Sequence, residues 1–417
     1  MLNKVMDQHV ITHAADMLAP GLDFANQGNS AEYIKSSKLV RWRAESGDRF
    51  SSAARSVRFR LSDTCWLQPG TVRFQATITN KAADTQPSNS INPCAHPLAM
   101  FTSAELTLGG QTVERIDNLT ALATIIDRLK SGERRMNESI ENHPLTAPDH
   151  SARASLQGTK SRRLIMELPF GLLRGKQWIP LHLLNNLTIQ LTLGDPLDAF
   201  NETSNVNFDL SDVSLLGTCL HTDTSLSQTY TQHLERGGLL AMSYSSITSS
   251  RHIVNSPDFT LSLSRGLSKL KQAYFVICKI GEKASRDHTS SLTNDVSDSN
   301  MEFHFEVGSS KYPDNACIGT QESFLRLKQA MGHMHDHQSI SIRPSDYVLK
   351  QSTFGIDFER CGNEASYTGL STRNGSVMTL QVKNSQATAA DVCQCFVYLV
   401  YDGIVNIRAG GAIDVLE

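Results

Sequence analysis

A strict alternation of apolar and polar residues marks one stretch near the middle of the chain. Thr188, Gln190 and Thr192 separate four apolar residues, which are Leu187, Ile189, Leu191 and Leu193. Because successive side chains of a strand point to opposite faces, this period of two predicts a strand with one face on a core and the other in water. A less regular version returns in the second half, at Leu270, Ala273, Phe275 and Ile277. The repetition predicts two similar β-domains in tandem.

Each half of the chain combines such strands with one helix. In the first half, alternation predicts strands at 57–61, 72–78 and 106–108, and apolar residues at helical spacing predict a helix over 119–129, with Asp117 and Asn118 as capping candidates. In the second half, a strand at 301–307 and a helix at 321–331 precede strands at 340–342, 378–382 and 393–401. The predicted fold class is all-β, with short helices in the loops.

The chain of 417 residues is long enough for two β-domains that each bury a core. Residues 1–50 show little periodicity and predict an extended N-terminal arm, which needs a partner surface to order it. We expect a first domain over 51–225, a linker over 226–250 and a second domain over 251–417.

Three polar segments, at 81–97, 133–160 and 283–300, predict long loops, and long loops on a β-scaffold usually form interaction surfaces. We expect them to lie at one end of a trimer of this chain, facing outward.

Composition describes an ordinary surface. The net charge is -3 and 19% of the residues are charged, which gives no global preference for nucleic acid or membrane. The first residues contain no apolar run typical of a signal peptide, and no apolar window of membrane-spanning length occurs elsewhere. From the sequence we therefore expect synthesis in a cytosol-like compartment.

The eight cysteines are scattered along the chain. Several lie on apolar faces of predicted strands, where a free thiol behaves as a small hydrophobic group, so we expect all eight to be buried thiols. Cys393 and Cys395 form a close pair without the second pair that a zinc site needs.

The most localised charge lies between Lys35 and Arg60. Eight cations face only Glu45 and Asp48 there, and they are Lys35, Lys38, Arg41, Arg43, Arg49, Arg55, Arg58 and Arg60. The first four, in the expected arm, are candidates for contact with a genome or an anionic membrane, because phosphate neutralisation needs no base sequence. Arg58 and Arg60 are also consistent with the solvated face of a strand, and Trp42 is a candidate packing anchor.

The segment GHMHDHQ offers the strongest candidate chemistry. His333, His335 and His337 alternate, so on an extended segment their side chains point the same way and suit a metal, with His304 as a candidate fourth ligand. The alternative is that they follow a helix end at Gly332, where histidines meet solvent and the helix C-terminus favourably. We therefore assign no metal, cofactor or catalytic residue.

Other catalytic patterns are absent from the sequence. It contains no G-x-S-x-G elbow, no Walker loop, no H-E-x-x-H and no dinucleotide fingerprint after a strand. Asp357 and Glu359 alternate in GIDFER and resemble a glycosidase pair, although alternate acidic residues more often form a solvated face. We expect the protein not to be an enzyme.

Several segments in order resemble the major capsid proteins of double jelly-roll DNA viruses, and the similarity is closest to polinton-like viruses and virophages. They are FDLSDVSLL at Phe208–Leu216, RGLSKLKQAYFV at Arg265–Val276, FEVGSSKYPDNACIGTQESFLRLKQAMG at Phe305–Gly332, and FGIDFER with YTGLSTRNGS within Phe354–Ser376. WIPLHLLNNLTIQLTL resembles a strand pair late in the family's first jelly roll, and VYDGIVNIRAGGAIDV resembles its last strands.

The resemblance implies two tandem eight-stranded jelly rolls in a structural protein of an icosahedral virion. It implies homotrimers that form pseudohexameric capsomers, with neighbouring capsomers, penton proteins and minor capsid proteins as partners. The viral genome or an internal membrane, contacted through the arm, is a further expected partner. A tandem carbohydrate-binding sandwich and a cupin-like metalloprotein remain the alternatives.

Overall fold

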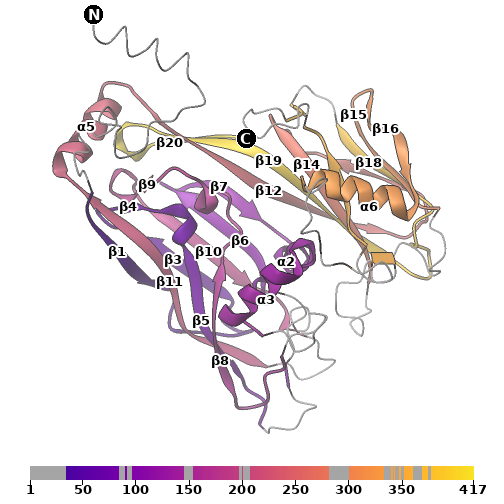
Figure 1. Cartoon of the computed structure of the whole chain (residues 1–417), viewed down its shortest axis with the longest axis horizontal. Helices are drawn as coiled ribbons and strands as arrows, with labels where there is room; N and C mark the ends of the chain where they lie inside the picture. Colours follow the sequence, from indigo (N-terminus) through magenta and orange to yellow (C-terminus); the bar gives the residue numbers. More distant parts are fainter. Residues whose placement is uncertain are drawn as a thin grey trace, which may run out of the picture.

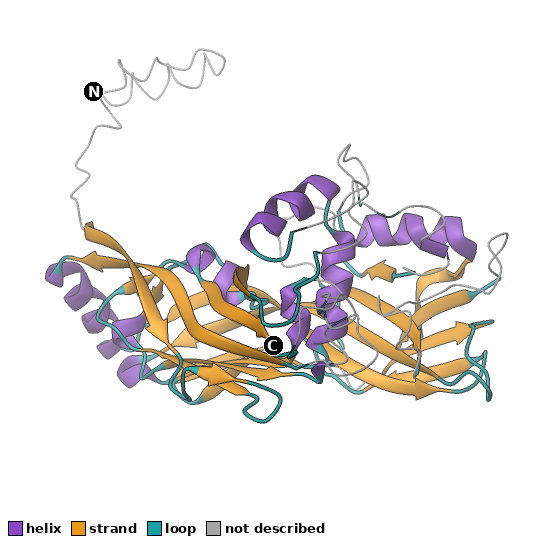
Figure 2. Ribbon diagram, turned by 90° about the horizontal axis from the view of Figure 1, so that it is seen from below, coloured by secondary structure: helices purple, strands orange, loops and turns teal. Residues whose placement is uncertain are grey.

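The computed structural model describes residues 34–83, 90–91, 96–144, 154–196, 200, 207–280, 300–332, 340, 342, 347–348, 352–359, 369–373 and 377–417. Two groups of strands lie side by side, and the helices lie outside them (Figures 1 and 2). Each group is a sandwich of two antiparallel sheets. In the described part of the chain, no helix is both long enough and apolar enough to cross a membrane.

The first sandwich contains eight main strands. They are β1 Ile34–Arg43, β3 Ser56–Leu61, β5 Arg73–Asn80, β6 Phe101–Leu108, β7 Gln111–Ile116, β8 Ser161–Glu167, β10 Leu187–Leu193 and β11 Phe208–Thr222. One sheet has the order β1-β11-β5-β8 and the other β3-β10-β6-β7. Three short strands extend the first sheet, and they are β2 Arg49–Phe50, β4 Trp66–Leu67 and β9 Ile179–Pro180.

The second sandwich also contains eight main strands. They are β12 Leu240–Val254, β13 Phe259–Leu263, β14 Leu270–Lys279, β15 Glu302–Val307, β16 Ser310–Ile318, β17 Phe354–Asp357, β18 Met378–Lys383 and β19 Cys393–Ile407. Its sheets have the orders β12-β19-β14-β17 and β13-β18-β15-β16, and β20 Ile413–Leu416 pairs with β19. Numbered by rank, the strands of each sandwich follow first-eighth-third-sixth and second-seventh-fourth-fifth. The two sandwiches therefore have the same topology.

The helices occupy equivalent places. Helices α2 Leu119–Leu129 and α3 Gly132–Glu141 lie between the fifth and sixth strands of the first sandwich, and α6 Gly319–Ala330 lies between those of the second. Both helices expected from apolar spacing are thus confirmed, whereas α3 falls in a segment expected to be a loop. Helix α3 was missed because only Ser139 on it is buried, so it has no apolar stripe.

A phenylalanine on the third strand anchors each core. Phe74 on β5 contacts the rings of Phe59 and Phe101 edge-on. Phe275 on β14 stacks on Phe354, and its ring also meets Phe303 and Phe305. Both anchors are fully buried. Since large aromatic side chains dominate core energetics, each sandwich has its own packing centre.

Two of the expected boundaries need correction. Residues 34–50 were expected in the arm, but β1 pairs along β11 and is the first strand of the first sandwich. Residues 226–250 were expected to be a linker, but they contain most of α5 Thr224–Glu235 and most of β12. The alternation of β1 is obscured because Trp42 is its one buried residue, as is typical of an edge strand. Residues 1–33 lie outside the described residues.

Candidate functional site

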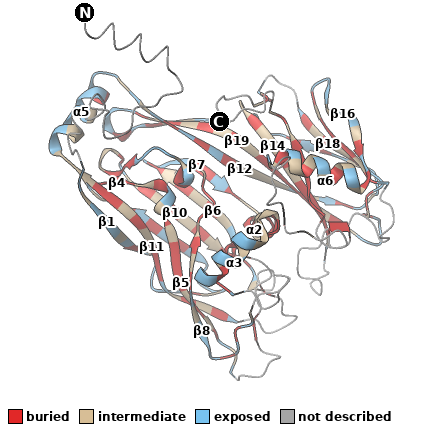
Figure 3. Ribbon diagram, viewed as in Figure 1, coloured by how far each residue is buried: buried red, intermediate tan, exposed pale blue. Residues whose placement is uncertain are grey.

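The seam between the two sandwiches is a continuous hydrophobic contact. Side chains of β12, β14 and β19 join the core cluster of the first sandwich, while their sheet also covers the core of the second. Strand β19 is accordingly buried along most of its length, whereas α5 is largely exposed (Figure 3). Because the shared sheet is buried on both faces, the two sandwiches form one packed unit.

Hydrogen bonds to β7 and to the turn after it cross the seam. The hydroxyl of Tyr398 donates to the carbonyl of Asn118 at 3.0 Å, and Asn118 Nδ2 donates to Ser249 Oγ at 3.3 Å. Tyr244 donates its hydroxyl to the carbonyl of Val113 at 3.2 Å. Asn118 was expected to cap α2, and it does occupy the cap position, but its side chain makes no capping hydrogen bond. The side chain contacts the second sandwich instead.

Glu114 on β7 is a buried carboxyl at this seam. Its two oxygens accept hydrogen bonds from the backbone N–H groups of Gly171 and Leu172 at 2.8 and 2.7 Å. Burial raises the pKa of Glu114 to about 7. The two N–H groups and the charge of Arg174 favour the anion and lower the pKa, but burial has the larger effect. Glu114 thereby fixes the loop that contacts β12, where Gly171 lies directly against the backbone of Ser245.

The candidate basic residues lie on β1, whose second edge pairs with no strand in the described part of the chain. Lys35 forms an ion pair with Asp223 at 2.6 Å, and this pair holds the pKa of Asp223 at about 2. Lys38, Arg41 and Arg43 are exposed, and none of them takes part in an ion pair with a described residue. Three unpaired cations on an open sheet edge form a surface that attracts anions.

The remaining residues singled out around β1 have structural roles. Trp42 is buried in the first core, where Gly217 of β11 gives its ring room, so its prediction as a packing anchor is confirmed. Arg58 and Arg60 alternate with buried residues on β3 and lie on its exposed face. Arg60 donates to Asn186 Oδ1 at 2.7 Å.

Glu359, one of the two acidic residues in GIDFER, belongs to a small ion cluster. Lys271 Nζ lies 3.1 Å from Glu359 and 3.8 Å from Asp402. Burial disfavours the lysine cation, but Asp402 and Glu359 outweigh it, so the pKa of Lys271 is raised. The carboxylates neutralise a cation, which favours the structural alternative to a glycosidase pair.

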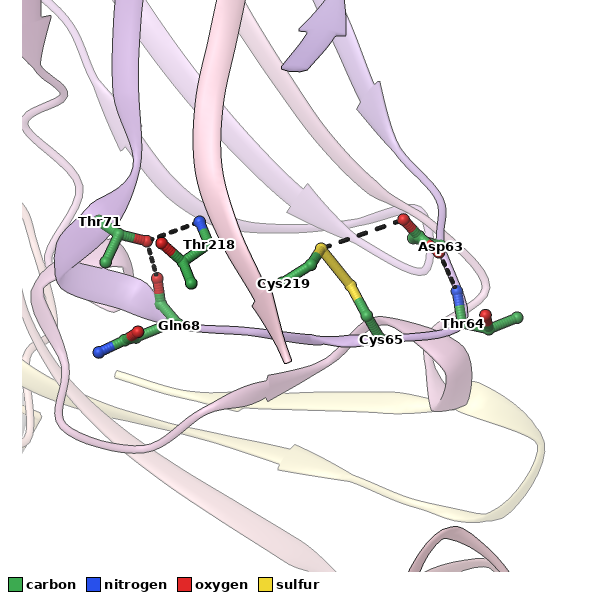
Figure 4. The surroundings of a disulfide bond; sticks show 7 residues. All are labelled: Asp63, Thr64, Cys65, Gln68, Thr71, Thr218 and Cys219. Atoms are coloured by element: carbon green, nitrogen blue, oxygen red, sulfur yellow. Dashed lines mark hydrogen bonds between the residues drawn. A yellow bond between two sulfur atoms is a disulfide. The ribbon is translucent and has the colours of Figure 1, made fainter. Parts of the chain in front are cut away.

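The cysteine prediction is wrong for two residues, because Cys65 and Cys219 form a disulfide (Figure 4). Strand β4 pairs with the end of β11, and this pairing brings the two Cα atoms to 5.6 Å. Sequence spacing gave no signal, since 154 residues separate them. Cys94 and Cys361 lie outside the described residues, and four others are confirmed as buried free thiols, which are Cys278, Cys317, Cys393 and Cys395.

The candidate metal ligands are not brought together in the described part of the chain. The histidines at 333, 335 and 337 lie outside the described residues, and His304 pairs with Glu306 at 3.3 Å. Within the described ranges, one group has metal-ligand spacing, and it consists of Asp63 with the two disulfide-bonded cysteines (Figure 4). The two sulfur atoms of this group form the disulfide, so they are not free thiolates that could bind a metal.

An apolar groove of about 850 Å³ opens beside the start of β1. It is lined by Ile34, Trp66, Trp178, Tyr230 and Leu239, among other residues. No local sequence pattern indicates this groove, because these residues come from five separate segments.

Comparison with known proteins was decisive only at the level of structure. No family model matches the sequence, and no curated protein matches it. PBCV-1 VP54, fitted into a cryo-EM reconstruction of the virophage Sputnik, matches with a TM-score of 0.65 at 9% identity, over 92% of this chain and 97% of that one. The Faustovirus major capsid protein matches with a TM-score of 0.60 at 7% identity, over 97% and 98%. The shared fold is the double jelly roll.

The mavirus major capsid protein has the same likeness, with a TM-score of 0.52 at 10% identity over 96% of this chain and 95% of that chain. This chain and each of the three capsid proteins match over nearly their whole lengths. The strand orders described above are those of two eight-stranded jelly rolls. The fold class expected from the sequence is therefore confirmed.

Proposed function

We propose that the chain is a major capsid protein that forms the shell of an icosahedral virus. The observation that carries the proposal is the pair of jelly rolls with one topology, held as a unit by a shared core. Likeness in fold to the Faustovirus and mavirus major capsid proteins over nearly the whole chain supports it. A shell protein needs rigid, repeated surfaces more than a reaction centre.

Three copies in a ring form the capsomer in this proposal. Two similar lobes in each of three chains give six similar lobes, which suit a position with six neighbours. A threefold ring uses a head-to-tail contact that closes on itself. Contacts between capsomers are individually weaker and act together across the shell.

The expected partners follow from this role. They are other copies of the chain in the virion, together with penton and minor capsid proteins, and the chain is made in the host cytoplasm before assembly. In this proposal the exposed cations Lys38, Arg41 and Arg43 face the genome or an internal membrane. Lysine and arginine side chains attract the phosphates of either one, and this attraction does not depend on base sequence.

The carbohydrate-binding alternative has one observation in its favour, the aromatic residues at the groove. Trp178 is 36% exposed there. Trp66, however, is buried, and the rings of His182 and Tyr230 meet it edge-on. A sugar site stacks its ligand on open aromatic faces. The groove offers one partly exposed tryptophan, which is weak support for a sugar site, so the capsid proposal is favoured.

Light scattering after size exclusion tests the proposal. A particle of about 138 kDa, three times 45.9 kDa, is the expected result. A stable particle of 45.9 kDa across the accessible concentration range would contradict the capsomer. Glycan and metal binding then become the measurements that decide between the two alternatives.

A further inference from the structure

The groove beside β1 is built from apolar side chains of several elements. Trp66 and Pro180 come from β4 and β9, Leu226 and Tyr230 from α5, and Met242 from β12. Its volume of about 850 Å³ lies in the range of sites that enclose a ligand or a peptide segment. Lys176 also lines it and gives it one positive charge.

Exposed apolar side chains are concentrated at this groove. Ile34 is 43% exposed, Trp178 is 36% exposed and Leu239 is 46% exposed, and all three line it. A contiguous exposed apolar surface on a folded chain usually marks a contact with another segment or molecule. The groove therefore needs an occupant.

The position of the chain end identifies one. Ile34 lines the groove and is the first described residue, so 33 residues of the same chain begin at its rim. A tethered segment has an effective concentration on the order of millimolar, so even weak affinity fills the groove.

The composition of those 33 residues complements the groove and its surroundings. They contain four acidic residues and one lysine, whereas the groove carries the positive charge of Lys176. They also contain apolar residues that suit the lining, including Leu2, Val5, Met6, Val10, Ile11, Met17 and Leu18. An acidic, partly apolar segment fits a basic-edged apolar groove better than it fits a genome.

We propose that residues 1–33 of each chain dock in the groove of that same chain. The proposal does not depend on the role in a viral shell. It changes the role of the expected arm, because the segment covers its own molecule and leaves the cations of β1 to meet other anions.

Photo-crosslinking in the full chain tests the docking. The crosslinking amino acid p-benzoylphenylalanine replaces Trp178, which is partly exposed and tolerates a similar aromatic group. We expect crosslinks to peptides from residues 1–33, in a product that migrates as one chain of 45.9 kDa on a denaturing gel. The matched control places the same group at Leu325 on α6, which is 44% exposed and far from the groove (Figure 1).

Three outcomes would overturn the proposal. A product of twice the chain mass would show that a second copy supplies the segment. Crosslinks from position 178 to other parts of the protein alone would show a different occupant. Crosslinks to residues 1–33 at equal yield from positions 178 and 325 would show a segment with no docking site.

Tryptophan fluorescence gives a second test in a chain without the crosslinker. Trp42 and Trp66 are buried, so acrylamide quenching reports mainly on Trp178. Serine in place of Val10, Ile11, Met17 and Leu18 in the full chain is expected to increase quenching. The same serine substitutions in a Trp178→Phe background are expected to change nothing. Unchanged quenching in the first variant contradicts docking in the groove.

Discussion

Strands β1 and β12 are the first strands of their jelly rolls, yet their surroundings differ. Strand β12 packs on the other jelly roll and buries Met242, Tyr244 and Ser246 along alternate positions. Strand β1 buries Trp42 alone and keeps Lys38, Arg41 and Arg43 in solvent. Two sandwiches of one topology therefore use the same strand differently. In the second sandwich this strand, β12, contacts the other jelly roll of the same chain. In the first sandwich the strand, β1, is open to contacts with other molecules.

The core anchors test whether the two jelly rolls are equivalent inside. We expect Phe74→Ala and Phe275→Ala each to lower the free energy of unfolding by about 3–5 kcal/mol, because each leaves a cavity among other aromatic rings. Chemical denaturation monitored by circular dichroism measures both. A loss below about 1 kcal/mol for one variant would break the equivalence of the two cores.

The seam is the next largest expected effect. A Cβ atom at Gly171 would lie 1.7 Å from the carbonyl oxygen of Ser245, so Gly171→Ala forces the jelly rolls apart. We expect a loss of about 1–3 kcal/mol in the same denaturation experiment. Gly70→Ala is the matched control, since no atom lies within 4 Å of its Cβ position. Equal stability of the two variants would argue against a rigid seam.

The pH dependence of the seam follows from Glu114. Its pKa is raised from 4.5 to about 7 in the folded chain, so the folded state binds more protons than the unfolded state between these values. The free energy of unfolding is expected to fall as pH rises from about 4.5 to about 7, by at most about 1.4 kcal/mol per pH unit. Thermal unfolding across this range measures it.

Glu114→Gln removes this titration while it keeps an oxygen acceptor for the loop. We expect the variant to lack the part of the pH slope that belongs to Glu114. Identical slopes in both proteins would show that the carboxyl does not titrate in this range.

Substitutions on strand β1 are expected to have the smallest effect on stability and a specific effect on binding. Arg41→Ser with Arg43→Ser is expected to change the free energy of unfolding by less than about 0.5 kcal/mol, because both side chains are exposed and form no ion pair with a described residue. Binding to DNA or to anionic vesicles is expected to weaken, with a shallower salt dependence. Arg58→Ser on β3 is the control. An equal loss of binding in the control would contradict a role specific to β1.

Local sequence pattern predicts the parts of the fold that bury one face. Strand β10 alternates buried and intermediate residues as expected, and the helices α2 and α6 are where apolar spacing places them. These elements are predictable because one-sided burial imposes its period on the sequence. Strand β1 and helix α3 bury too little to carry such a period.

The candidate sites depend on contacts between distant segments, so the sequence predicts them less well. The cations of β1 were found from their local density, but the free sheet edge beneath them was not. The disulfide, the Glu114 contact with Gly171 and the apolar groove each join residues from separate elements. The spacing of residues in the sequence does not predict such contacts, since the topology of the whole sandwich brings the segments together.

The most direct test of the central claim is a cryo-EM reconstruction of the purified oligomer. We predict three chains in a closed ring with six jelly-roll lobes, in which the seam between β12 and the first sandwich is kept within each chain. A ring of another copy number, or a reconstruction in which the two jelly rolls of one chain are separated, would contradict it.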